Sequence, residues 1–319
     1  MLKPRLGRLD IARGVALIAM AIYHFGWDLE FFGYLQQGSA SQGWWRIFAR
    51  CIASSFLFLV GFSLVLAHGR AIRWQPFFKR FAQVAIAAAM ISALTWFFVP
   101  QGFIFFGILH QIALASLIGL LFLRVPVWLT IITAAAIIAA PATLRFEIFD
   151  HPALWWVGLS TSNPVSNDYV PLFPWFGAVL LGMSAARIML KTGTLSWLQG
   201  GVRPQWLHDS LTFIGRHSLV FYLVHQPVLM GLIFIASQLV PPSPSIQAAN
   251  FISQCNRQCS IESDPQLCNL YCNCMLETIQ NKQVTSLLSN RNASNEDRQQ
   301  LGDISLQCVA KAQEGEPVF

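Results

Sequence analysis

The chain has 319 residues, of which 55% are hydrophobic and only 11% are charged, and its mean hydropathy is +0.51. Soluble domains carry about 25% charged residues, so this composition excludes an ordinary soluble domain and indicates an integral membrane protein. The formal net charge of +6 is small. We interpret it through membrane topology rather than as a sign of nucleic-acid binding.

Apolar stretches of about 20 residues, the length that spans a bilayer, recur along the whole first part of the chain. Seven candidates cover roughly residues 11–33, 44–68, 77–99, 103–123, 126–145, 170–190 and 211–240. No small-residue cleavage site ends the first candidate, so we expect a retained helix rather than a cleaved signal peptide. The sequence therefore predicts an all-α, polytopic transmembrane bundle of about seven spans.

Basic residues, which favour cytoplasmic loops, gather on one side of such a bundle. The clusters at the N-terminus and between the spans comprise Lys3, Arg5, Arg8, Arg13, Arg70, Arg73, Lys79, Arg80, Arg124, Arg187, Lys191, Arg203 and Arg216. The loops 34–43, 100–102 and 146–169 on the opposite side contain no Lys or Arg. We therefore expect a multi-pass protein of a bacterial inner membrane, with a cytoplasmic N-terminus and a periplasmic C-terminal tail.

The C-terminal segment differs sharply from the rest of the chain. We expect a transmembrane domain over 1–240, a Pro-rich linker over 241–250, where prolines prevent the helix from continuing, and a Cys-rich helical tail over 251–319. The tail holds six of the seven cysteines: Cys255, Cys259, Cys268, Cys272, Cys274 and Cys308. This density predicts three disulfides, which require an oxidising compartment, in agreement with a tail outside the cytoplasm.

Spacing alone leaves the disulfide connectivity open. Two pairs of cysteines are four residues apart, which places each pair on one helix face. A helical hairpin could then be stapled, for example, by Cys255–Cys272 and Cys259–Cys268, which would leave Cys274 for Cys308. Six cysteines allow 15 pairings, and a zinc site is the competing interpretation of the same residues.

Ionisable groups inside membrane spans are energetically costly and usually mark function or pair with one another. Three histidines qualify, namely His24, His110 and His225. Counted at about 1.5 Å per residue from the nearest cytoplasmic arginine, they lie about 13 to 21 Å into the membrane. We therefore expect the three histidines to lie at comparable depths, where they could converge on one site.

The first span carries a polar stripe. Eleven residues, almost three helical turns, separate Arg13 from His24, and Asp28 follows one turn later, so all three share a helix face. A carboxylate at this spacing can orient the imidazole and raise its basicity. At the start of the stripe, Arg5, Arg8 and Arg13 group around Asp10, and guanidinium groups suit phosphate or pyrophosphate.

The segment "RLDIARGVALIAMAIYHFGWDL" (8–29) resembles the first helix of the heparan-alpha-glucosaminide N-acetyltransferase family, in its small bacterial branch. More distantly, it is similar to membrane O-acyltransferases that modify surface polysaccharides, which share an Arg-rich start and a His in their first helix. Four further segments resemble the family's later helices in the same order, namely 54–64, 105–117, 171–182 and 214–229. The resemblance covers about residues 5–240 and leaves the tail outside.

The resemblance implies acyl transfer across a membrane, from cytosolic acetyl-CoA to an amine or hydroxyl of an envelope sugar or glycan on the far side. It implies that Arg8 and Arg13, beside Asp10, meet the CoA phosphates. His24 would deprotonate the acceptor or receive the acyl group, with Asp28 as its orienting partner. His110 and His225 are second-rank catalytic candidates. The expected partners are the lipid bilayer, the CoA thioester and the acceptor; no metal and no nucleic acid are expected, and a homo-oligomer is left open.

Two positions depart from the lysosomal member of the family. That enzyme has Asn at the position aligned with His24, and Gln111 of "GILHQ" (107–111) replaces the Arg of its "GVLQR" motif. The polysaccharide acyltransferases, with a His in the first helix, are therefore the better template for His24.

The same residues allow other interpretations. The histidines could form the relay of a proton-coupled transporter or channel, or they could ligate a haem or metal, although no motif supports this. A single intramembrane His can also be a helix–helix hydrogen-bond partner. Arg13 can be a topogenic residue, and Asp28 can lie near enough to the outer surface to be solvated.

Overall fold

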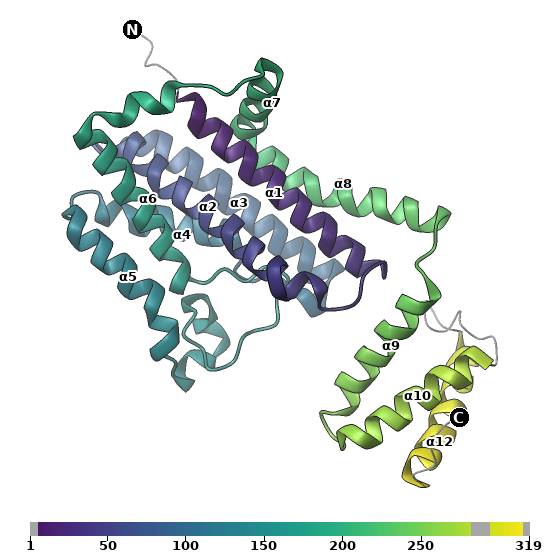
Figure 1. The fold of residues 1–319 in the computed structure, drawn as a ribbon. Coiled ribbons are helices and arrows are strands. Elements are labelled where there is room, and N and C mark those ends of the chain that lie inside the picture. Colours follow the sequence, from purple (N-terminus) through teal and green to yellow (C-terminus); the bar gives the residue numbers. More distant parts are fainter. Residues whose placement is uncertain (1–5, 282–293, 315–319) are drawn as a thin grey trace. The chain divides into compact units, whose positions relative to one another are not determined.

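The structure, a computed structural model, describes residues 6–281 and 294–314, and this part of the chain contains helices and no strands. Lys3 and Arg5 of the basic N-terminus lie outside the described residues. The apolar region forms α1 (Gly7–Phe31), α2 (Gly43–His68), α3 (Trp74–Phe98), α4 (Ile108–Phe122), α5 (Val127–Thr143), α6 (Leu172–Thr192), α7 (Gln205–Arg216) and α8 (Ser218–Leu239) (Figure 1).

Five of the described helices, α1, α2, α3, α6 and α8, are long and apolar enough to cross a membrane. The helices α4 and α5 are apolar but shorter, with 15 and 17 residues. Each of the seven predicted stretches thus corresponds to an apolar helix. The all-α, multi-pass fold predicted from the sequence is confirmed.

Three of the predicted stretches are longer than the helices inside them. Helix α4 begins at Ile108 rather than near 103, because the segment before it pairs with a distant loop. The Asn167 amide donates to the Gly102 carbonyl at 3.1 Å, and the Val170 amide donates to the Phe106 carbonyl at 3.0 Å. This pairing replaces the first helical turns and fixes the loop 144–171 against the start of α4.

The seventh stretch is two helices. At His217 the backbone leaves helical geometry (φ −99°, ψ 30°), which separates α7 from α8. The depth of His225 in the membrane is therefore counted from Ser218 rather than from Arg216. Ser218 is seven residues away, which corresponds to about 10 Å along the helix. Helix α5 ends at Thr143, earlier than predicted. Arg145 therefore lies in the loop between α5 and α6, which we expected to be free of basic residues.

The described chain forms two compact units. The first comprises the residues up to Ile22 together with Ile47–Pro227, and the second comprises Tyr23–Arg46 with the residues from Val228 on. The predicted division into 1–240, a linker and a tail stays a prediction.

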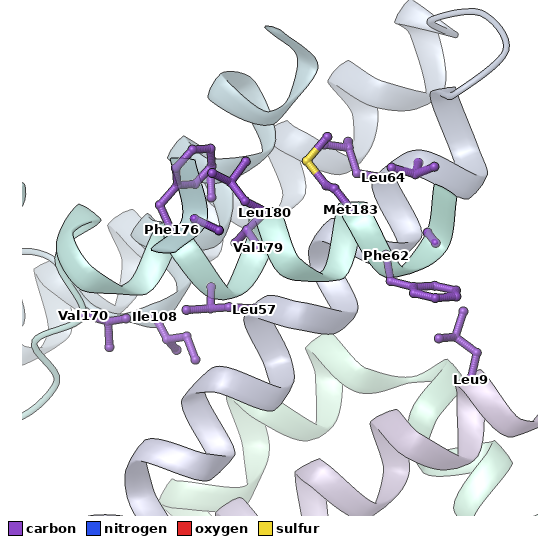
Figure 2. Packing of buried hydrophobic residues seen from close by; sticks show 14 of the residues in the cluster. Leu9, Leu57, Phe62, Leu64, Ile108, Val170, Phe176, Val179, Leu180 and Met183 are labelled. Atoms are coloured by element: carbon purple, nitrogen blue, oxygen red, sulfur yellow. The ribbon is translucent and has the colours of Figure 1, made fainter. Parts of the chain in front are cut away.

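The core of the first unit centres on α6. Val179, Leu180 and Met183 are fully buried there, and Figure 2 shows them beside residues of the neighbouring helices. Glycines bring α2 and α6 together: a Cβ at Gly61 would collide with the Val179 carbonyl, and a Cβ at Gly182 would collide with the Phe58 carbonyl. Small residues at helix interfaces are typical of membrane proteins, where close van der Waals packing drives association.

The second unit contains the helices α9 (Pro244–Cys259), α10 (Pro265–Asn281) and α12 (Asn295–Glu314). Helix α9 begins inside the stretch expected to be a linker. Three disulfides join the helices: Cys255–Cys272, Cys259–Cys268 and Cys274–Cys308. This is the hairpin arrangement given above as an example, and the structure selects it over the alternatives.

Removing the third disulfide is expected to destabilise the tail. Cys274 and Cys308 are 34 residues apart, and closing a loop of that length stabilises a folded state by about 4 kcal/mol in the chain-entropy model. In the double variant Cys274→Ser/Cys308→Ser, amide hydrogen exchange in α10 and α12 should accelerate strongly. The variant Cys51→Ser, which removes the exposed free thiol, is the control; equal exchange in both variants would contradict a stabilising crosslink.

Candidate functional site

The polar stripe of the first span lies on one uninterrupted helix. Helix α1 runs from Gly7 to Phe31 without a break, so spacings of eleven and four residues keep Arg13, His24 and Asp28 on the same face. Asp28 is completely buried, which excludes the alternative that it is simply solvated. The predicted stripe is therefore present as a continuous helical feature.

Two aromatic rings, those of Tyr23 and Trp45, lie beside the outer part of this stripe. The His24 ring lies edge-on to Tyr23 at 5.6 Å between centroids, and Tyr23 lies 6.1 Å from Trp45. Gly26 allows Trp45 to approach, since an added Cβ would lie 2.9 Å from the indole ring. The half-buried imidazole thus lies in an aromatic environment rather than in open solvent.

Glu30, an acidic residue that was not selected from the sequence, organises the loop after α1. The carboxylate of Glu30 accepts hydrogen bonds from the backbone amides of Gly38 and Ala40, each at 2.7 Å. This contact folds the loop after the helix back onto its last turn. The sequence offered no signal for it apart from an acid at the end of an apolar run.

At the beginning of α1, Arg13 belongs to a polar network between helices. Its Nη1 contacts Asp10 Oδ1 at 2.9 Å, and its Nη2 donates to Ser63 Oγ of α2 at 2.6 Å. The second oxygen of Asp10 lies 3.6 Å from Arg216 Nε. Asp10 therefore neutralises two arginines, and Arg13 is held by partners inside the bundle.

Arg8 lies in a different environment. Its guanidinium carbon is 4.3 Å from the centre of the Trp197 ring, in the 3₁₀ helix Thr194–Gln199. Five residues separate Arg8 from Arg13, which turns them about 140° apart on the helix. The two arginines of the predicted anion clamp thus contact different elements, and their joint role in binding CoA stays a prediction.

His110 is engaged through both ring nitrogens. Nδ1 accepts the Gly107 amide at 3.2 Å, and Nε2 lies 3.2 Å from Ser92 Oγ. The Ser92 hydroxyl donates to the Ile104 carbonyl at 2.6 Å. Because that hydroxyl proton is used, Nε2 carries the ring proton and donates to Ser92. His110 thereby caps the first turn of α4, an arrangement that suits a positioning role.

His225 bonds to its own helix. Its Nδ1 lies 2.7 Å from the Tyr222 carbonyl and 3.2 Å from the Phe221 carbonyl. Carbonyls only accept, so Nδ1 carries the proton, and in the neutral ring Nε2 is the basic nitrogen. His110 and His225 belong to the first unit, whereas His24 and Asp28 belong to the second; the convergence of the three histidines stays a prediction.

Asp168, a half-buried acid at the start of α4, was not selected from the sequence. The Oδ2 atom of Asp168 accepts the Ile108 amide at 2.8 Å, and Gly107 is needed for this approach, because an added Cβ would collide with that carboxylate. The carboxylate also lies within electrostatic range of Tyr222 in α8. The glycine directly before an apolar helix was the available signal.

A comparison with protein families identifies the chain. The model of the heparan-alpha-glucosaminide N-acetyltransferase catalytic domain matches residues 5–227. The chain belongs to this family. Membership supports a membrane acetyltransferase-type function, as the resemblance implied. No curated protein and no solved structure matches the chain significantly.

The family match includes every candidate site residue and ends before the Cys-rich tail. Within it, Gln111 is fully buried, and both atoms of its amide group lack a hydrogen-bond partner in the described structure. At this position the chain thus places a neutral polar group in an apolar core. Among the described residues, no group of three His, Cys, Asp or Glu side chains is arranged to hold a metal ion.

The half-buried Asp168 gives the loop 144–171 a testable pH dependence. Burial raises the pKa of Asp168 to about 6, although the Ile108 hydrogen bond opposes the shift. In the unfolded chain the carboxyl ionises near pH 3.9, so the folded state retains the proton up to a higher pH than the unfolded state does. Stability is therefore highest below about pH 4 and falls as the pH rises toward 6.

Hydrogen exchange of the Ile108 and Val170 amides between pH 4 and 7, corrected for intrinsic rates, should show this loss in the wild type and not in Asp168→Asn. Asp150, whose pKa is lowered to about 2 by hydrogen bonds from Ser160 and Thr161, changes charge below this window. The same slope in wild type and variant would contradict the assignment.

Proposed function

We propose that the chain transfers an acetyl group from acetyl-CoA in the cytoplasm to an amine or hydroxyl of a sugar on the periplasmic side of a bacterial inner membrane. The single observation that carries this proposal is the family match over residues 5–227. The bias of basic residues toward one side of the apolar helices supports the orientation. The disulfides of the tail support its exposure to an oxidising compartment.

In this proposal His24 is the general base. It takes a proton from the acceptor while the acceptor nitrogen or oxygen attacks the thioester carbonyl, and the C–S bond breaks to release CoA thiolate, which is then protonated. Asp28, one turn beyond on the same face of α1, orients the imidazole and stabilises its charged form. The complete burial of Asp28 supports this role, because a carboxylate out of water interacts more strongly with a nearby cation.

The donor is proposed to enter from the end of the bundle where α1 begins. Arg8 and Arg13 supply positive charge there for the CoA phosphates, and Asp10 holds Arg13 in place. Of the two, Arg8 has no acidic partner among the described ion pairs, since the contacts of Asp10 go to Arg13 and Arg216. Arg8 is therefore the arginine better suited to receive a phosphate.

The proposal is tested with purified protein in proteoliposomes, supplied with acetyl-labelled CoA outside and glucosamine inside. Labelled N-acetylglucosamine inside the vesicles is expected for the wild type. Mass spectrometry of envelope glycans from cells with and without the protein identifies the natural acceptor. If the wild type binds no CoA but moves protons or a solute across the vesicle membrane, the transporter hypothesis replaces this one.

A further inference from the structure

A cluster of polar groups lies where the start of α1 meets the loop before α7. We define it by Arg8, Trp197, Gly200, Gly201 and His208. A Cβ added to Gly200 would lie 3.0 Å from three atoms of the Arg8 guanidinium group, and a Cβ added to Gly201 would lie 2.8 Å from His208 Nδ1. The Arg8–His208 cluster therefore depends on two consecutive glycines, against which the two side chains pack.

Two buried polar atoms of this cluster lack hydrogen-bond partners in the described structure. Arg8 Nη1 and His208 Nδ1 are both buried, and neither has a hydrogen-bond partner. Leaving a buried polar group unsatisfied costs about 1–3 kcal/mol, and more for a charged group. The two groups lie against neighbouring residues of one loop, so a single ligand contacting that loop can satisfy both.

A third unpartnered group lies one helical turn further along α7. Thr212 is 4% exposed, and its hydroxyl has no partner. It shares a helix face with His208 and with Gly215, whose own position against the Asp10 carbonyl shows that this face packs on α1. Unsatisfied polar groups therefore recur along the junction of α1 with α7.

The exposed ring of Trp197 adds a second kind of contact. One part of the ring is covered by the Arg8 guanidinium group, yet 64% of the residue is accessible. Exposed tryptophan rings stack well with nucleobases, and arginine donors suit phosphate. A nucleotide that carries a phosphate monoester close to its base matches a cation and an aromatic ring held side by side.

We propose that the Arg8–His208 cluster binds the 3′-phosphate of coenzyme A, with Arg8 and His208 as phosphate contacts and Trp197 as the platform for the adenine. The identity of the ligand rests on the proposed function. The inference goes further in assigning recognition of the 3′-phosphate to His208, a residue that the sequence analysis did not select. His208 then serves to distinguish CoA from dephospho-CoA.

The test measures the Kd of CoA and of dephospho-CoA for the full chain in phosphatidylcholine nanodiscs, with adenosine 3′,5′-bisphosphate as a competitor. The wild type should bind CoA more tightly than dephospho-CoA and should be competed by the bisphosphate. In His208→Gln, the affinity for CoA should fall about tenfold, as expected for one charge-assisted hydrogen bond. The affinity for dephospho-CoA should be unchanged, because the lost contact is to the missing phosphate.

Matched variants guard against general effects on folding. His217→Gln changes the exposed histidine at the end of the same α7 helix and should leave both affinities unchanged. Gly201→Ala moves the His208 ring without removing it, and it should weaken the binding of CoA more than that of dephospho-CoA. Gly231→Ala, at a glycine with open space around it, is its control. Arg8→Lys keeps the positive charge and should lose only part of the preference for CoA.

Equal loss of affinity for CoA and dephospho-CoA in His208→Gln, or no loss for either, would overturn the inference. A wild type that binds neither CoA nor the bisphosphate would overturn the inference and the proposed function together. Acetyl transfer by a wild type without preference for CoA would overturn the inference alone. Selective CoA binding without acetyl transfer would overturn the proposed function alone. Competition by phosphatidic acid but not by the bisphosphate would assign the cluster to a lipid headgroup and overturn the nucleotide assignment.

Discussion

Replacing His24 with alanine is expected to lower the rate of acetyl transfer by about 10²- to 10⁴-fold, the usual contribution of a positioned general base. The acceptor nucleophile must lose its proton as it attacks the thioester, and no water replaces the imidazole efficiently in an aromatic, half-buried environment. Because CoA binding is assigned to other residues, the Kd of CoA should stay close to the wild-type value. The measurement is single-turnover transfer from labelled acetyl-CoA in proteoliposomes, together with CoA binding.

The controls separate a chemical role of His24 from a structural one. His217→Ala removes an exposed histidine outside the candidate site and should retain wild-type transfer. Asp28→Asn keeps the shape of the buried side chain and removes its charge, so transfer should fall by less than in His24→Ala. Full transfer by a folded His24→Ala protein would show that another group is the base. Retained proton movement without transfer in the wild type would favour the relay hypothesis.

Adding a methyl group at Gly61 is expected to destabilise the first unit by about 1–3 kcal/mol or more, the range found for overpacked cores. The added Cβ would collide with the backbone carbonyl of Val179, and a helix backbone cannot move aside like a flexible side chain. Helices α2 and α6 would have to separate, which would loosen the packing of Leu57, Val179 and Met183. Gly182→Ala, which faces the Phe58 carbonyl on the same interface, should act in the same direction.

The matched control is Gly231→Ala in α8, where an added Cβ meets nothing within 4 Å. Alanine is a better helix former than glycine by about 0.5–1 kcal/mol, so this variant should be neutral or slightly stabilising. Thermal unfolding in detergent, followed by tryptophan fluorescence and by size-exclusion profile, compares the variants. A Gly61→Ala protein as stable as Gly231→Ala would contradict the close α2–α6 contact.

The helical bundle was predictable because it depends on local hydrophobicity. Stretches of about 20 apolar residues leave no alternative to helices in a membrane, where every backbone polar group must be satisfied internally. The helix boundaries that were predicted wrongly are those set by contacts between residues distant along the chain. Helix α4 starts late because residues 102–106 pair with the loop around Asn167 and Val170, and no local pattern announces a partner some 60 residues away.

In the candidate site, too, the features set by local spacing were predictable, and those set by distant contacts were not. The common face of Arg13, His24 and Asp28 follows from helical periodicity, and the continuous α1 retains it. The different environments of Arg8 and Arg13, the cap formed by Asp168 on α4 and the involvement of both nitrogens of His110 depend on neighbours from other helices. Those neighbours are far away in the chain, so spacing along one helix could not indicate them.

By itself the sequence determined the all-α membrane architecture, the disulfide-rich C-terminal segment and the family, since hydropathy, cysteine density and motif order are all encoded locally. Only the tertiary structure decided which of the 15 disulfide pairings exists, that Asp28 is buried, that Arg8 meets Trp197, and that Arg8 and His208 pack against consecutive glycines. These features are contacts between segments distant along the chain. Their geometry depends on how the helices pack, and helix packing depends on side-chain shapes and glycine positions on several helices at once.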